Sequence, residues 1–201
     1  MFSKAFLLLL SGCAFAQEMP VFGTTVASSS GLRGNIYFLK PVQEELPNFK
    51  QMRPAGAIYT TSLRVSPRDF QQGFPGITDR FEWFAIDYIG RFWVDQPGIY
   101  RFRLLSDDGS KLYVNDKLLI DNDGLHQPEA IDGSAHFSRG VYRLRVSYFQ
   151  GPRQYVALVL SVARPGGEAW KIFDTNDFQP PPDPREWLPG TLRDIKRGSN
   201  Y

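Results

Sequence analysis

The sequence predicts an all-β protein, an antiparallel β-sandwich or jelly-roll-like barrel, and three observations support this prediction. Segments in which apolar and polar residues alternate recur along the chain, and Gly, Pro, Asn and Asp separate them. Helical periodicity with capping residues is hard to find. Strands at this spacing without intervening helices favour antiparallel packing over a parallel sheet with crossover helices.

The clearest strand is expected at residues 140–148. One face carries Tyr142, Leu144, Val146 and Tyr148, and the other carries Arg143, Arg145 and Ser147. Such alternation is typical of a strand with one face in the core and one in water. Further strands are expected at 33–39, 57–65, 81–94, 99–105, 111–115, 117–121, 130–137 and 154–162.

Two short polar segments predict turns between these strands. Residues 95–98, Asp-Gln-Pro-Gly, predict a tight turn, and Asn115-Asp116 predicts the corner of a hairpin. Together these turns predict a meander through residues 81–121.

The composition limits the classes of protein to which this chain can belong. The 201 residues are 42% hydrophobic and 14% aromatic, which is enough for one domain with a substantial core. The net charge is only +2 and both signs are mixed along the chain, so the basic footprint of a nucleic-acid binder is missing. We therefore expect no nucleic-acid partner.

The first 16 residues are typical of an export signal. Lys4 is basic, an apolar run begins at Ala5, and Ala14-Phe15-Ala16 forms a small-residue cleavage site. This run is well short of the ~20 residues that a membrane span needs, and no later segment approaches that length. We expect secretion to the periplasm or exterior, and the alternative is a lipid anchor on Cys13, because "LLSGC" is similar to a lipobox.

The remaining chain divides by composition into a domain and two flanks. We expect a Gly/Ser/Thr-rich lead-in at 17–30, one β-sandwich domain at 31–178 and a Pro-rich tail at 179–201. The tail is a candidate contact for a protein partner.

The stretch "SDDGS" at residues 106–110 carries the strongest candidate for a site. Adjacent carboxylates repel each other, so Asp107 and Asp108 must lie in water, accept backbone N–H groups in a turn, or share a cation. In the turn alternative, Gly109 is expected to adopt a positive φ.

The run from Arg80 to His126, "RFEWFAIDYIGRFWVDQPGIYRFRLLSDDGSKLYVNDKLLIDNDGLH", resembles the protective-antigen-fragment (PA-fourteen) domain family. The flanks "GLRGNIYFL" and "VSYFQGPRQYVALVLSV" are similar to the opening strand and the closing strand pair of that family. The resemblance spans about residues 31–178 and implies a jelly-roll β-sandwich, usually a module of secreted or surface proteins.

The resemblance also implies chemistry. Several members bind carbohydrate, and the flocculin-type adhesins do so through calcium held by two consecutive aspartates that a cis peptide joins. On this analogy Asp107 and Asp108 are the metal ligands. The chain departs from the adhesin pattern in the later loop, where "FQGPRQY" offers Gln150, Gln154 and carbonyl groups but no Asn or Asp.

Two other segments supply candidate ligand contacts. Asp121, Asn122, Asp123 and His126 form a polar loop after a predicted strand, which could bond sugar hydroxyls or could simply turn the chain at Asp123-Gly124. Arg153 is the arginine we expect to meet a ligand. Only two histidines are present, so zinc is not expected.

No sequence signature of a nucleophile, a phosphate-binding loop or a metalloprotease is present. The sequence therefore predicts an exported, non-catalytic carbohydrate-binding module, and calcium at Asp107 and Asp108 stays one of the open alternatives for the Asp pair. Two alternatives stay open: a structural or protein-interaction domain without a sugar site, and a glycosidase-like enzyme that uses paired carboxylates.

Overall fold

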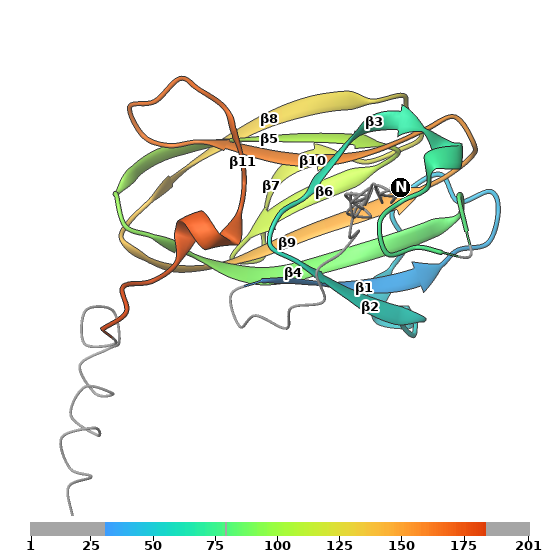
Figure 1. Ribbon diagram of the computed structural model, residues 1–201, viewed down its shortest axis with the longest axis horizontal. Coiled ribbons are helices and arrows are strands. Elements are labelled where there is room, and N and C mark those ends of the chain that lie inside the picture. The colour runs from blue at the N-terminus through green and yellow to red at the C-terminus, as the bar shows by residue number, and fades with distance from the viewer. Residues whose placement is uncertain (1–30, 79, 184–201) are drawn as a thin grey trace, which may run out of the picture.

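The computed structural model describes residues 31–78 and 80–183. The predicted export signal, the lead-in and residues 184–201 of the predicted tail lie outside the described residues. Eleven strands and three short 3-10 helices form the described chain (Figure 1). The strands are β1 Leu32–Phe38, β2 Gly56–Thr60, β3 Arg64–Asp69, β4 Phe84–Val94, β5 Gly98–Asp107, β6 Ser110–Val114, β7 Lys117–Asn122, β8 Glu129–Phe137, β9 Gly140–Gln150, β10 Tyr155–Ala163 and β11 Lys171–Ile172. The 3-10 helices are η1 Phe49–Gln51, η2 Phe70–Gln72 and η3 Thr175–Phe178.

The strands form two sheets that face each other, so the prediction of an all-β antiparallel sandwich is confirmed (Figure 1). One sheet has six strands in the order β2-β1-β4-β9-β6-β7. The other follows the order β11-β10-β5-β8, and β3 pairs with β10 as well. No helix of the described residues has the length and apolar character that a membrane crossing requires.

Two expectations about strand connections are wrong. The predicted strand at 57–65 is divided, because the chain leaves the six-stranded sheet after Thr60 and enters the opposite sheet as β3. The predicted meander through 81–121 is also wrong, since β4, β5 and β6 alternate between the two sheets and do not pair in sequence. The β6–β7 hairpin is confirmed, and its corner residues Asn115 and Asp116 have φ values of 48° and 65°.

The core between the sheets is unusually rich in aromatic rings. Phe92 illustrates the packing, because its ring meets Phe102, Phe137, Phe173 and Phe178 edge to face at centroid distances of 5.6–6.4 Å. Such arrangements suit the charge distribution of aromatic rings and add to the stabilisation from burial. The inclusion of Phe178 means that η3 belongs to the packed domain.

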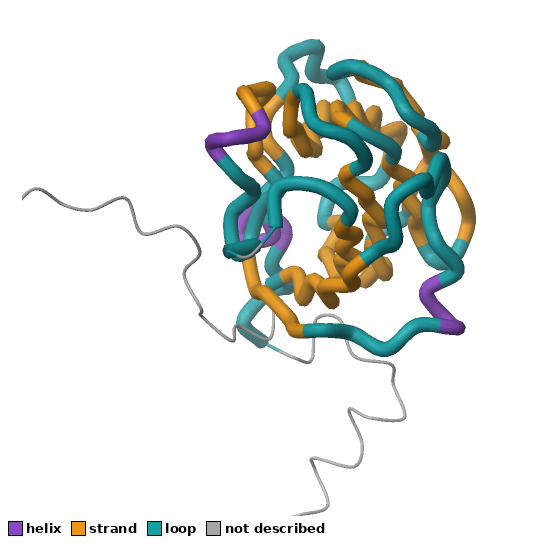
Figure 2. The backbone as a smooth tube through the Cα atoms, turned by 90° about the vertical axis from the view of Figure 1, so that its right-hand side faces the viewer, coloured by secondary structure: helices purple, strands orange, loops and turns teal. Residues whose placement is uncertain are grey.

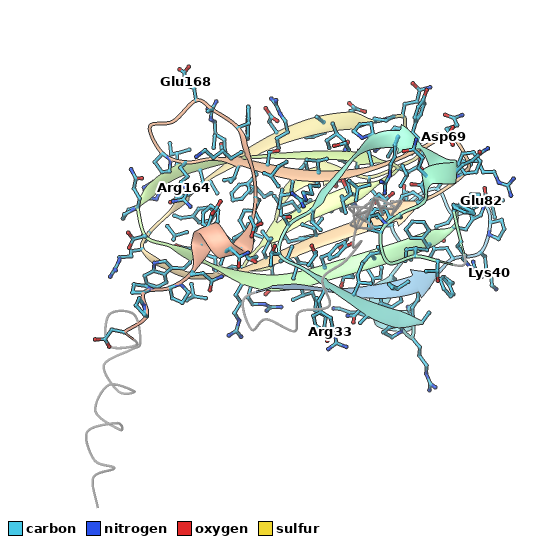
Figure 3. The ribbon with its side chains drawn as sticks, in the orientation of Figure 1. Arg33, Lys40, Asp69, Glu82, Arg164 and Glu168 are labelled. Atoms are coloured by element: carbon cyan, nitrogen blue, oxygen red, sulfur yellow. The ribbon has the colours of Figure 1, made fainter. Side chains whose placement is uncertain are left out.

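The two ends of the sandwich differ in what they carry. In Figure 3, Glu82 and Lys40 lie at one end, whereas Arg164 and Glu168 lie at the other. β5 runs antiparallel to β10 and ends at Asp107, which pairs with Ala157 near the start of β10. Figure 2 views the sandwich from the end with Glu82, where loops cover the strand ends.

Candidate functional site

The Asp pair lies where the chain passes from one sheet to the other. β5 ends at Asp107 in one sheet, and β6 begins at Ser110 in the opposite sheet. The peptide bond between Asp107 and Asp108 is cis, as the resemblance implies. Both residues are nearly enclosed, with 2% and 5% of their surface exposed. Buried carboxylates require hydrogen-bond donors, a cation or a proton.

Asp108 is held by donors from two loops. Its Oδ2 accepts the backbone N–H of Gly151 at 2.7 Å, and its Oδ1 accepts the backbone N–H of His126 at 3.2 Å. Backbone N–H groups that point at a carboxylate stabilise its charged form. The charge of Asp108 is therefore compensated by the main chain of the loops after β7 and β9.

Gln150 links the two carboxylates. Its Nε2 lies 3.5 Å from Asp107 Oδ1 and 3.4 Å from Asp108 Oδ2, and it donates a stronger bond to the carbonyl of Tyr155 at 2.9 Å. Its Oε1 accepts from the hydroxyl of Tyr148, which also lies 2.7 Å from the carbonyl of Asp107. The amide thus presents N–H groups to the Asp pair, and the described residues give the Asp107 carboxylate one long hydrogen bond, of 3.5 Å.

The electrostatics follow from this difference in partners. Burial, and then the charge of Asp108, raise the pKa of Asp107 to about 7. Burial also raises the pKa of Asp108, while the N–H groups of Gly151 and His126 act in the opposite direction. The pKa of the Tyr148 hydroxyl is well above its ordinary value because of burial and the two carboxylates. Asp107 is the weakly compensated charge of the pair.

Gly109 is needed for space and not for a positive φ. The described glycines with positive φ do not include it, so the predicted left-handed conformation is wrong. A Cβ at Gly109 would lie 2.4 Å from Cε1 of Phe149 and 2.7 Å from Oδ1 of Asp123. The turn after the Asp pair is therefore pressed against β9 and the loop after β7.

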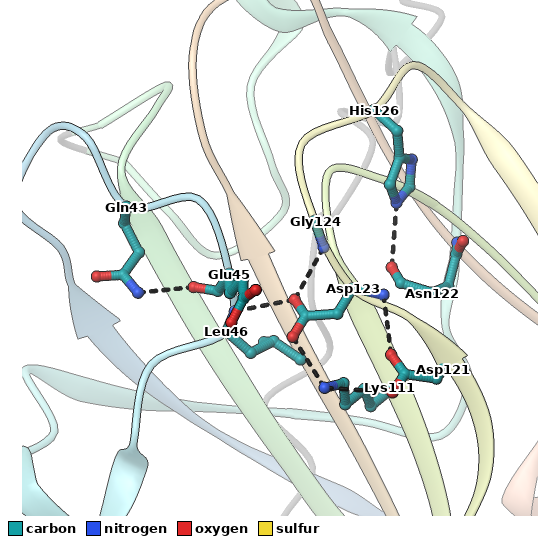
Figure 4. A network of polar contacts seen from close by, with 9 residues as sticks. All are labelled: Gln43, Glu45, Leu46, Lys111, Asp121, Asn122, Asp123, Gly124 and His126. Carbon is teal, nitrogen blue, oxygen red and sulfur yellow. Dashed lines mark hydrogen bonds and ion pairs between the residues drawn. The ribbon is translucent and has the colours of Figure 1, made fainter.

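The predicted polar loop lies beside the Asp pair, because the backbone N–H of His126 donates to Asp108. Most side chains of the loop bond to the protein itself (Figure 4). Asp123 uses both oxygens: Oδ1 accepts from the N–H of Leu46, and Oδ2 pairs with Lys111 Nζ at 2.9 Å. Asp121 is exposed and also pairs with Lys111, at 3.4 Å. Asn122 is buried and donates to Ser106 Oγ at 3.0 Å.

His126 is the member of this loop that reaches the Asp pair, and it does so through its backbone N–H. Its ring is turned away, with Nε2 3.0 Å from the carbonyl of Asn122 and Nδ1 2.8 Å from that of Gln127. The loop therefore holds Asp108 through a backbone N–H, and the network of Figure 4 fixes the position of the loop.

Arg153 lies at the same end of the sandwich, two residues beyond Gly151. Its side chain is 66% exposed and pairs with Glu82 Oε1 at 3.1 Å. The guanidinium also lies over the ring of Phe70, 5.8 Å from its centroid. These contacts leave Arg153 largely exposed at this end of the sandwich, beside Glu82 and Phe70.

The side-chain oxygens around the Asp pair are too few to complete a calcium site by themselves. Calcium takes about six to eight oxygens. Asp107 and Asp108 supply carboxylates, but the described residues contain no group of three or more acidic, histidine or cysteine side chains arranged around a common point. The remaining oxygens would have to be backbone carbonyls, water or hydroxyl groups of a ligand, and Gln150 turns its N–H groups toward the pair.

Comparison with known proteins identifies the family. The sequence profile of the PA14 domain matches residues 64–176, and the chain belongs to this family. No curated protein sequence matches the chain. The structure of the PA14 domain of the MpAFP antifreeze protein aligns with a TM-score of 0.62 and 18% identity, covering 73% of this chain and 88% of that one.

Two further similar structures are adhesin domains. The PA14 sugar-binding domain of an RTX adhesin aligns with a TM-score of 0.58 and 17% identity, over 73% of this chain and 96% of that one. The epithelial adhesin 9 A domain of Candida glabrata, in complex with Galβ1-3GlcNAc, aligns with a TM-score of 0.53 and 13% identity, over 78% and 92%. At these identities the likeness shows a shared fold.

Proposed function

We propose that this chain is a non-catalytic carbohydrate-binding module whose ligand site is the sandwich end with Asp107 and Asp108. The observation that carries the proposal is the weak compensation of Asp107, a buried carboxylate with one hydrogen bond of 3.5 Å. A sugar hydroxyl is a suitable extra donor, because it can donate to the carboxylate and accept from a neighbouring N–H.

Membership of the PA14 family supports the choice of ligand. Two proteins of similar fold are described as a sugar-binding domain and as an adhesin in complex with a disaccharide. Both belong to adhesins, so binding without catalysis is the function we carry over to this chain. We also propose that the protein is exported, with a mature N-terminus at Gln17. Mass spectrometry that found a diacylglycerol on Cys13 would contradict simple secretion.

Calcium assistance by Asp107 and Asp108 stays a prediction. A cation that binds only the folded protein raises its stability by RT ln(1 + [L]/Kd). A rise in unfolding temperature on adding calcium, absent from an Asp108→Asn variant, is the expected result if calcium is held at the pair. An unchanged unfolding temperature in the wild type would contradict it.

A glycan array tests the proposed function. The mature protein is applied to immobilised glycans in calcium and again in EDTA. Binding to a defined group of glycans supports the proposal, and loss of that binding in EDTA supports the calcium contribution. An array without any binding contradicts the proposal and favours a protein-interaction or structural role. Release of reducing sugar from a polysaccharide panel would contradict the absence of catalysis.

A further inference from the structure

Trp83 has a backbone conformation that its local sequence does not favour. Its φ is 57°, in the left-handed region that bulky side chains rarely adopt. The carbonyl of Trp83 accepts the N–H of Leu39 at 2.8 Å, and its own N–H points to the carbonyl of Gly151 at 3.4 Å. Strain of this kind persists only where surrounding contacts fix it, and such positions gather at ligand sites.

One residue connects Trp83 to the Asp pair. The carbonyl of Gly151 faces Trp83, while its N–H donates to Asp108 at 2.7 Å. A Cβ at Gly151 would lie 2.6 Å from Cδ2 of Leu125 and 3.0 Å from Oδ2 of Asp108. The backbone of Gly151 therefore brings an aromatic residue, an aliphatic side chain and a buried carboxylate together at one place.

The indole of Trp83 is supported on one side and partly open to solvent. It packs against a small cluster formed by Tyr37, Leu39, Ala85 and Phe149. Phe149 also presses against Gly109, directly after the Asp pair. Trp83 thus offers a rigid, partly exposed apolar surface beside the Asp pair.

We propose that Trp83 is the stacking residue of the glycan site and selects ligands with an exposed pyranose face. The C–H face of the ring packs on the indole, and hydroxyl groups on its edge reach the Asp pair. Leu125, 44% exposed, supplies a second apolar contact beside Gly151. The inference rests on the proposed function. Among the neighbouring aromatics Phe84, Tyr88, Phe92 and Trp93 are buried and are not available for stacking.

Trp170 provides a matched control. It is also half-buried, but it lies under the guanidinium of Arg103 at 4.5 Å and belongs to the segment before β11. Glu168, two residues earlier, marks the end of the sandwich opposite Glu82 (Figure 3). A substitution at Trp170 therefore removes a tryptophan without touching the Asp pair.

The experiment uses the mature protein and soluble probes, namely Galβ1-3GlcNAc and the methyl pyranosides of galactose, glucose, mannose and N-acetylglucosamine. For the probe that the wild type binds best, Trp83→Ala should weaken the Kd by about tenfold, the size expected for an aromatic contact of about 1.4 kcal/mol. Trp170→Ala should bind as the wild type does. Thermal unfolding checks that each variant is folded.

Tryptophan fluorescence gives a second readout that survives a folding failure of the alanine variant. A probe-induced change in emission should persist in Trp170→Phe and disappear in Trp83→Phe. Unchanged affinity in Trp83→Ala, or a fluorescence change retained in Trp83→Phe, overturns the role of Trp83 while the proposed function stands. If none of the probes nor any glycan on the array binds the wild type, the proposed function itself fails, and the role of Trp83 fails with it.

Discussion

Replacement of Asp107 by Asn should stabilise the protein without ligand at pH 8 and have little effect at pH 5. The substitution keeps the shape of the side chain and removes a buried charge beside Asp108. An asparagine can offer its oxygen to Gln150 and its NH2 group to Asp108, so both partners of the site keep a hydrogen bond. The cost of the charge in the wild type then becomes measurable as a difference in stability.

The size of the effect follows from the pKa of Asp107, which burial and Asp108 raise to about 7. An unfolded aspartate titrates near ~3.9. Because the folded state holds the proton more tightly, the free energy of unfolding falls as the pH rises from about 4 to about 7, and then levels off. Integration of this linkage from pH 5 to pH 8 gives a loss of about 2–3 kcal/mol in the wild type that the variant lacks.

Urea unfolding at pH 5 and pH 8 measures this difference. The control is Asp121→Asn, which changes an exposed carboxylate 3.4 Å from Lys111 Nζ and should shift stability by no more than about 0.5 kcal/mol, because Lys111 keeps its closer partner Asp123. Equal losses of stability in the wild type and Asp107→Asn between the two pH values would refute the assignment. So would a variant that is less stable than the wild type at pH 8.

Two further predictions concern packing. Gly151→Ala places a methyl group against Leu125 and Asp108, so it should lower the free energy of unfolding by about 1–3 kcal/mol and abolish glycan binding. A variant with the stability and the glycan affinity of the wild type would contradict the packing described for this loop. Phe178→Ala should cost about 3–5 kcal/mol because its ring is buried among core aromatics, whereas deletion of the chain after Phe178 should leave the fold intact. Thermal unfolding of both variants measures these effects, and a fall of more than ~10 °C in the unfolding temperature on deletion would show that the tail is packed.

The strands could be predicted because period-2 alternation is a local signal that burial imposes on each strand. The expected segment at 140–148 lies within β9, and 99–105 lies within β5. The assignment of strands to sheets could not be predicted in the same way. Residues 57–65 read as one strand, but the carbonyl of Leu63 accepts the N–H of Leu160 in the opposite sheet. That partner lies almost a hundred residues away, and alternation does not encode it.

The candidate site, too, could be predicted in part. The Asp pair stands out in the sequence because neighbouring carboxylates repel each other and need compensation. The donors that compensate the charge of the pair could not be predicted. Gly151 is 43 residues from Asp108, and no sequence feature near Gly151 distinguishes its N–H as a donor. The role proposed for Trp83 could not be predicted from the sequence either, because its left-handed φ arises from contacts with Leu39 and Gly151 that only the folded chain brings together.

The most direct test of carbohydrate binding at the Asp pair is calorimetric titration with the best soluble glycan from the array. The wild type should show saturable binding. A double variant, Asp107→Asn with Asp108→Asn, should unfold cooperatively and show no binding heat, because both carboxylate acceptors are gone. Binding by the folded double variant with the affinity of the wild type would contradict the account, since the glycan would then be recognised elsewhere on the domain.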